Sequence, residues 1–162
     1  MTEAEFLPLF DQYHSRVYRL ALSVTRSPHD AEDMVQTVFL RLLAARPGPE
    51  PGKERAWLTQ VTLNASRDLL RARKRQGWSP LEEDIPAVPR ESLGLYDAVM
   101  DLPEKYRTAI HLHYYEGYTC REIARFLHIT PSAVSMRLHR AREMLRNALK
   151  EEDYETSLSG PV

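Results

Sequence analysis

The chain has 162 residues, of which 43% are apolar and 28% charged, and its formal net charge is −1. These values are typical of a soluble globular protein with one ordinary domain or two small ones. The first ten residues carry acids where a secretory signal needs bases, and no apolar run approaches the roughly 18 residues of a membrane span. We therefore expect a cytoplasmic protein, and its single cysteine cannot form an internal disulfide.

The near-neutral total results from segregated charges that cancel. Residues 53–76 and 118–150 each carry a net charge of +5, and residues 77–117 between them carry −5. The two ends of the chain, residues 1–52 and 151–162, carry −2 and −4. Two separate basic segments favour two contacts with a polyanion, although basic helix faces can also be simply solvated.

Apolar residues at three- and four-residue spacings predict three helices in the first half of the chain. The first apolar stripe covers residues 6–24. The second helix begins at Ser27, whose hydroxyl can cap it, with Pro28 in the first helical position. Three prolines and two glycines at 46–53 end that helix, because a helix cannot cross them. A third helix is expected over 55–75.

The second half of the chain begins with an acidic, proline-containing stretch without helical period, which predicts a linker. Two helices then follow, a short one at 93–100 and another within 101–117, which Gly117 ends. We find no period-two alternation and predict an all-α protein. The predicted organisation is a three-helix domain at 1–76, a linker at 77–92, a second helical domain at 93–150 and an acidic tail at 151–162.

The stretch TCREIARFLHITPSAVSMRLHRAR predicts two short helices joined by a tight turn. Thr119 and Glu122 form the pattern of a capping box at the first helix. Thr130 and Pro131 begin the second helix, which should run to about residue 150. His128 lies in the turn, where the backbone needs positive φ and glycine is favoured, although histidine tolerates this conformation better than most residues.

The outward side of the second helix carries short polar groups, an apolar side chain and an arginine, a combination typical of a helix that enters the major groove. The residues predicted to face bases are Ser132, Ser135, Met136, His139 and Arg140. The arginines better placed for phosphates, which fix position without reading sequence, are Arg121, Arg125, Arg137 and Arg142. A solvated helix in a small bundle would have a similar composition, so the hairpin alone leaves both interpretations open.

No residue pattern indicates catalysis, a cofactor or a metal site. His111 and His113 are two residues apart on a predicted helix, so they point in different directions, and no acid or cysteine is spaced to join them. The sequence has no glycine-rich phosphate loop and no Ser/His/Asp order. We therefore expect a protein that is not an enzyme.

Three segments in this order resemble the extracytoplasmic-function (ECF, group 4) sigma factors of the bacterial sigma-70 family over about residues 4–150. They are SPHDAEDMVQTVFLRLL, RAWLTQVTLNASRDLLRARKR and LPEKYRTAIHLHYYEGYTCREIARFLHITPSAVSMRLHRARE. The resemblance implies a sigma region 2-like domain and a region 4-like helix-turn-helix domain. It implies a subunit that directs promoter-specific transcription initiation by binding core RNA polymerase and recognising the −10 and −35 elements.

The resemblance also implies roles for named residues. Asp30, Asp33 and Gln36 match the motif that docks on the coiled coil of the polymerase largest subunit, and helical geometry leaves Asp33, Gln36, Thr37, Leu40 and Arg41 outside the apolar seam. The residues implied in opening the −10 element are Gln60, Asn64, Arg67, Arg71 and Lys74, with Asp68 structural. The partners implied are promoter DNA, the polymerase coiled coil and flap, and an anti-sigma factor. The proline-rich loop departs from the family pattern at the pocket for a flipped base.

Two other classes of function fit parts of the sequence. A stand-alone repressor or response-regulator output domain would use the same hairpin, but it leaves the second basic segment unexplained. An interaction protein could use its basic helices to contact an acidic protein. Binding that resists nuclease and lacks steep salt dependence would favour this second alternative.

Overall fold

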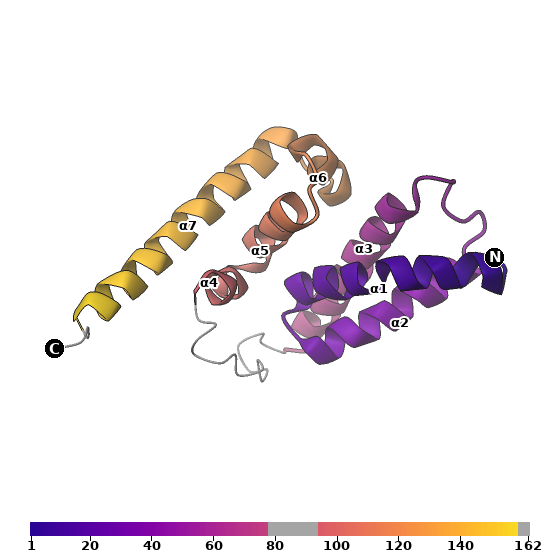
Figure 1. Ribbon diagram of the computed structural model, residues 1–162, viewed down its shortest axis with the longest axis horizontal. Helices are drawn as coiled ribbons and strands as arrows, with labels where there is room; N and C mark the ends of the chain where they lie inside the picture. Colours follow the sequence, from indigo (N-terminus) through magenta and orange to yellow (C-terminus); the bar gives the residue numbers. More distant parts are fainter. Residues whose placement is uncertain (78–93, 159–162) are drawn as a thin grey trace. The chain divides into compact units, whose positions relative to one another are not determined.

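The computed structural model describes residues 1–77 and 94–158, with side chains up to residue 150. The regular secondary structure of these described residues is helical, which confirms the all-α prediction (Figure 1). The chain divides into two compact units, residues 1–86 and 87–162, which are described separately. Apart from Gly77, the predicted linker at 77–92 lies outside the described residues.

Unit 1 is a three-helix domain of α1 (Glu3–Thr25), α2 (Pro28–Ala44) and α3 (Glu54–Arg75). Each of its helices packs against the other two (Figure 1). Ser27 caps α2 by accepting a hydrogen bond from the Asp30 amide at 3.2 Å, with Pro28 in the first turn, as predicted. A cap of this kind contributes about 1 kcal/mol to helix stability. Between α1 and α2, Arg26 adopts the left-handed conformation, with φ of 59°.

The start of α1 has a capping box that the sequence analysis did not identify. The Glu5 amide donates to the Thr2 hydroxyl at 3.3 Å, and the Thr2 amide donates to the Glu5 carboxylate at 2.9 Å. The hydrogen bond from the Thr2 amide favours the charged carboxylate and lowers the pKa of Glu5 below its ordinary value. The box lets the helix begin at Glu3 even though Pro8 lies within it.

The core of unit 1 lies between the apolar faces of its three helices. One cluster contains Val17, Val38, Phe39, Leu42 and Leu58, and the ring of Phe10 packs edge-on against Phe39 with 4.9 Å between centroids. A second cluster contains Ala21, Ala31, Met34 and Ala65. Because these faces turn inward, the opposite sides of α2 and α3 are left to solvent.

Unit 2 contains α4 (Leu95–Asp101), α5 (Glu104–Ile110), the π-helical turn η3 (His111–Tyr115), α6 (Cys120–Leu127) and α7 (Pro131–Leu158). The helix expected within 101–117 is therefore α5 followed by a wider π-helical turn, and Gly117 beyond it has φ of 76°. The α7 helix continues beyond the predicted end near residue 150 to Leu158. Its sequence contains no glycine or proline after Pro131 until Gly160, so nothing interrupts it earlier.

The core of unit 2 holds the short helices against α7. Its buried apolar side chains include Ile110, Leu112, Ile123, Ala124, Leu127, Val134, Leu138 and Ala141. Arg107 is also buried, and its guanidinium donates to the carbonyl of Leu102 at 2.7 Å. This bond satisfies a backbone acceptor at the end of α4 and so ties α4 to α5.

Candidate nucleic-acid interface

Helices α6 and α7 form a helix-turn-helix hairpin with defined caps. The Glu122 amide donates to the Thr119 hydroxyl at 3.2 Å, and the Thr119 amide donates to the Glu122 carboxylate at 3.1 Å, which confirms the predicted capping box. At the start of α7, the Thr130 hydroxyl accepts from the Ala133 amide at 3.1 Å. Both helices therefore begin at the residues that their sequences predict.

The turn between α6 and α7 requires an unusual backbone conformation at His128. Its φ of 57° and ψ of 42° place it in the left-handed region, which confirms the prediction of positive φ. The backbone amides of His128 and Ile129 both donate to the carbonyl of Ala124, at the end of α6. Ala124 itself is buried at the hairpin, where a small side chain allows close approach.

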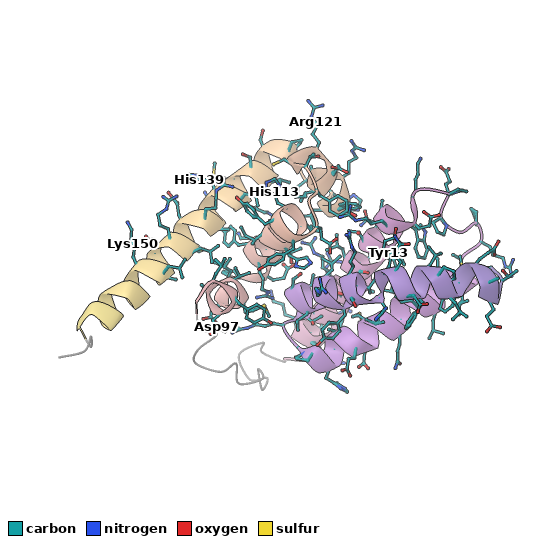
Figure 2. The ribbon with its side chains drawn as sticks, in the orientation of Figure 1. Tyr13, Asp97, His113, Arg121, His139 and Lys150 are labelled. Carbon is teal, nitrogen blue, oxygen red and sulfur yellow. The ribbon has the colours of Figure 1, made fainter. Side chains whose placement is uncertain are left out.

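The face of α7 that turns away from the core carries most of the predicted base-facing residues. Ser132, Ser135 and His139 are exposed, and Met136 is 50% exposed. Figure 2 shows His139 and Arg121 projecting outward from α7 and α6. The imidazole Nε2 of His139 lies 3.4 Å from the Glu143 carboxylate on the next turn of α7.

The predicted arginines of the hairpin differ in their surroundings. Arg121 and Arg125 are exposed on α6, and Arg137 is half-buried on α7. Arg140 is exposed, and its interaction with the phenol of the buried Tyr106 lowers the pKa of that phenol.

Arg142 interacts with a tyrosine of η3, the turn that follows α5. Its Nη1 donates to the Tyr114 hydroxyl at 2.8 Å. Tyr106 and Tyr114 thus each interact with one arginine of α7. The sequence analysis did not identify either tyrosine, because each lies far from its arginine in the chain.

A second basic face lies in unit 1, along α3. Asn64, Arg71 and Lys74 are exposed, and Gln60 and Arg67 are half-buried. The side-chain amide of Gln60 donates to the Asn64 carbonyl oxygen at 3.0 Å, which orients the Asn64 amide. An exposed ion pair joins Asp68 to Arg71 at 3.5 Å. The charged end of α3 therefore offers side chains to a polyanion independently of unit 2.

The acidic and apolar face of α2 forms a third surface, but Asp30 is not part of it. Asp33, Gln36, Leu40 and Arg41 are exposed and Thr37 is half-buried; these five residues are called the α2 docking face below. Leu40 is 64% exposed. Asp30, by contrast, is 1% exposed and forms an ion pair with Arg73 of α3. Asp30 was expected at the polymerase-docking surface from its position in the motif, but it is buried against α3 and is not exposed there.

A cavity of about 500 Å³ lies beside the proline-rich loop of unit 1. The loop residues Gly48, Pro49 and Pro51 line it, together with side chains from the start of α1 and the end of α2. Glu5 and Glu54 supply the carboxylates of its lining.

Metal clusters and membrane-spanning helices are both absent from residues 1–77 and 94–158, the described part of the chain. There, no three His, Cys, Asp or Glu side chains come together as metal ligands, and no described helix is long and apolar enough to cross a membrane.

Two family descriptions match consecutive parts of the chain. Residues 9–76 match sigma-70 region 2, and residues 92–145 match sigma-70 region 4. The first match contains the α2 and α3 surfaces, and the second contains the hairpin. The three surfaces described above thus fall within two regions of one family.

Curated relatives support the same family. The ECF RNA polymerase sigma factor SigE of Mycolicibacterium smegmatis is 35% identical over 93% of this chain, which spans 64% of that protein. The RNA polymerase sigma factor CarQ of Myxococcus xanthus is 32% identical over 94% of this chain and 93% of its own length. The ECF RNA polymerase sigma factor SigM of Mycobacterium tuberculosis is 31% identical over 89% of this chain and 76% of its own length.

Solved structures show the same fold. The sigma factor RpoE in complex with the anti-sigma factor NepR from Bartonella quintana has a TM-score of 0.78 and 24% identity, covering 90% of this chain and 97% of that one. CnrH in complex with the cytosolic domain of CnrY has a TM-score of 0.67 and 25% identity, covering 93% and 90%. From the matched regions and the relatives, this chain belongs to the extracytoplasmic-function sigma factors of the sigma-70 family and acts as an RNA polymerase sigma factor in transcription initiation.

Proposed function

We propose that this chain is a non-catalytic specificity subunit that docks on core RNA polymerase through the α2 docking face and contacts promoter DNA at two separate places. The observation that carries the proposal is the presence of two exposed basic faces, on α3 and on the α6–α7 hairpin, in two different compact units. Each face alone binds weakly. Polymerase holds both basic faces on one promoter. Once one face has bound, the effective concentration of the other face at its own DNA site is raised.

The hairpin is proposed to read the −35 element. Base contacts are assigned to the exposed side chains at the start and middle of α7, and phosphate contacts to the surrounding arginines. The base-facing set is Ser132, Ser135, Met136, His139 and Arg140; the phosphate set is Arg121, Arg125, Arg137 and Arg142.

The face of α3 is proposed to capture the opened −10 element. Its polar and basic side chains can follow the phosphates of one strand while Asn64 meets an unstacked base. The set is Gln60, Asn64, Arg67, Arg71 and Lys74. Asp30 is reassigned from the docking face to a structural role, since its carboxylate is buried. The domain limits 1–76 and 93–150, the linker 77–92 and the tail 151–162 remain part of the proposal.

Regulation by an anti-sigma factor is proposed as well. One structure with this fold, that of RpoE, was solved as a complex of a sigma factor with an anti-sigma factor. The α2 docking face is a surface that a regulator could cover to prevent polymerase binding.

Run-off transcription with core polymerase on fragmented genomic DNA tests the proposed function. We expect core polymerase with this chain to start from a small set of fragments, and core polymerase alone to start from none of them. Tight binding of the isolated chain to a short duplex, without any transcription in the presence of core polymerase, would instead identify a stand-alone repressor.

A further inference from the structure

We infer that Tyr114 contributes to DNA binding, and that its hydroxyl and the Arg142 guanidinium together bind one backbone phosphate at the flank of the hairpin. This inference rests on the proposed function, in which unit 2 contacts duplex DNA. It adds a residue outside the two hairpin helices to the binding surface.

The π-helical turn η3 places Tyr114 where Arg142 can reach it. Backbone amides in this region bond to carbonyls farther back than in an α-helix: Glu116 donates to the carbonyl of His111 and Tyr118 to that of Leu112, both at 3.0 Å. Such turns widen a helix locally and recur at functional sites. The wider turn places the phenol beside α7, although residues 114 and 142 are 28 positions apart in the chain.

The ring of Tyr114 is held in place from its other side. The imidazole of His113 packs edge-on against it, with 4.8 Å between centroids and an interplanar angle of 84°. His113 is itself fixed, because its Nδ1 lies 2.9 Å from the carbonyl oxygen of Tyr118, within hydrogen-bond distance. Figure 2 shows His113 beside α5, within unit 2. A phenol restrained in this way loses little freedom when it binds a ligand.

The polar ends of Tyr114 and Arg142 form a suitable arrangement for an anion. The Tyr114 oxygen accepts from Arg142 Nη1 at 2.8 Å, so the phenolic proton is directed toward a different acceptor. A guanidinium has five N–H donors, of which this bond uses one. Tyr114 is 54% exposed and Arg142 is exposed, so both present donors to solvent. Two adjacent donors, one of them charged, match the oxygens of a phosphate.

The salt dependence of DNA binding tests this role, because each phosphate contact contributes about 0.9 to the slope of log K against log salt. The probe is the genomic fragment with the strongest run-off, bound by the assembled holoenzyme. The variants are Tyr114→Phe, which removes one hydroxyl, Arg142→Ala, and the double variant. Tyr115→Phe is the matched control: Tyr115 is 62% exposed and its ring, which stacks on His111, is retained.

We expect Arg142→Ala to reduce the salt slope by about one unit, as loss of a single phosphate contact requires. Tyr114→Phe should weaken binding by roughly threefold and reduce the slope in the same direction, and the double variant should bind like Arg142→Ala. The loss should be equal on a fragment with a scrambled upstream hexamer, since phosphates carry no sequence information. Tyr115→Phe should bind as wild type, and all four variants should melt at the wild-type temperature.

Two results would overturn the inference. If Tyr114→Phe has the slope and affinity of wild type, or if its effect adds fully to that of Arg142→Ala, then Tyr114 and Arg142 do not bind one shared phosphate. A chain that programs transcription from no fragment would overturn the proposed function, and this inference with it. A programmed fragment with unchanged slopes would overturn this inference alone.

Discussion

Asp30 of α2 and Arg73 of α3 form a bidentate ion pair inside unit 1, 43 residues apart in the chain. Nη1 and Nη2 of Arg73 donate to the two carboxylate oxygens of Asp30. The Asp30 side chain is 1% exposed, and that of Arg73 is 24% exposed. The Asp30 amide is also the group that Ser27 caps. The pair therefore joins the first turn of the docking helix to the last turn of the basic helix.

Breaking this ion pair should destabilise unit 1. Asp30→Asn removes the negative charge that pairs with Arg73. We expect the free energy of unfolding to fall by about 3 kcal/mol, which is the lower end of the range for breaking buried ion pairs, because Arg73 is partly exposed. Hydrogen exchange of the buried amides of α3 measures this loss of stability in the intact chain. Asp68→Asn is the matched control, since its pair with Arg71 is exposed and contributes less than about 1 kcal/mol. Equal exchange rates in the two variants would contradict this prediction.

The left-handed backbone at His128 predicts a different pattern of stability changes. His128→Val should destabilise unit 2 by about 1–2 kcal/mol, because a β-branched side chain collides with its own backbone at positive φ. His128→Gly should be at least as stable as wild type, since glycine adopts this conformation without strain. Thermal unfolding of the three chains checks the order. Arg125→Val, at a regular helical position, should cost only about 0.5 kcal/mol; a similar loss at both positions would count against the backbone explanation.

The sequence predicted features that depend on neighbouring residues. Caps at Ser27, Thr119 and Thr130, and the positive φ at His128, each follow from a few consecutive side chains, and the structure confirms them. Apolar periodicity likewise located the helices, because it records which face is buried.

Features that depend on distant residues were not predictable. Asp30 is polar and lies in an acidic motif, so its sequence indicates exposure; its burial follows from Arg73, which only the packed helices bring near. The contacts of Tyr106 and Tyr114 with arginines of α7 have the same origin. No pattern in the sequence of residues 111–115 predicted the π-helical turn η3.

The α2 docking face predicts the effect of a small substitution on polymerase binding. Leu40→Ser should weaken binding to core polymerase by at least tenfold, because burying a leucine against a partner contributes about 1.5–3 kcal/mol. A titration of labelled chain with core polymerase measures the affinity. Leu7→Ser, at a leucine of α1 that is 47% exposed, should leave it unchanged. If the two variants bind equally well, α2 does not dock through Leu40.

Asn64 predicts a defect that depends on the state of the DNA. Asn64→Ala should reduce run-off from duplex promoter by about tenfold, the effect of losing one good base contact. A template that is already unpaired across the −10 element should restore most of the run-off yield of this variant at saturating holoenzyme. On such a template the base is already unstacked, so the contact with Asn64 is not needed to compensate for the energy of unstacking. Asn147→Ala, at an exposed asparagine of α7, is the control. An equal defect on both templates would exclude a role in opening.

Met136 predicts that the −35 element is read partly through thymine methyl groups. Ser135 and Met136 are uncharged and lie at the centre of the exposed face of α7. The Met136 side chain is 50% exposed, so it can make an apolar contact in the major groove. Replacing each thymine of the upstream hexamer by uracil removes one methyl group without changing pairing. At the contacted position, wild-type holoenzyme should bind about fourfold more weakly, which corresponds to roughly 0.8 kcal/mol for one buried methyl.

The same uracil substitutions in Met136→Ala separate this contact from others. This variant should bind the thymine fragment as weakly as wild type binds the uracil fragment, and it should show no further loss with uracil, because the two changes remove the same contact. His139→Ala should remain sensitive to uracil at that position. If wild type ignores every uracil, or if Met136→Ala stays as sensitive as wild type, the thymine methyls are not what Met136 contacts, and the −35 preference must come from Ser135, His139 and Arg140 or from the shape of the DNA.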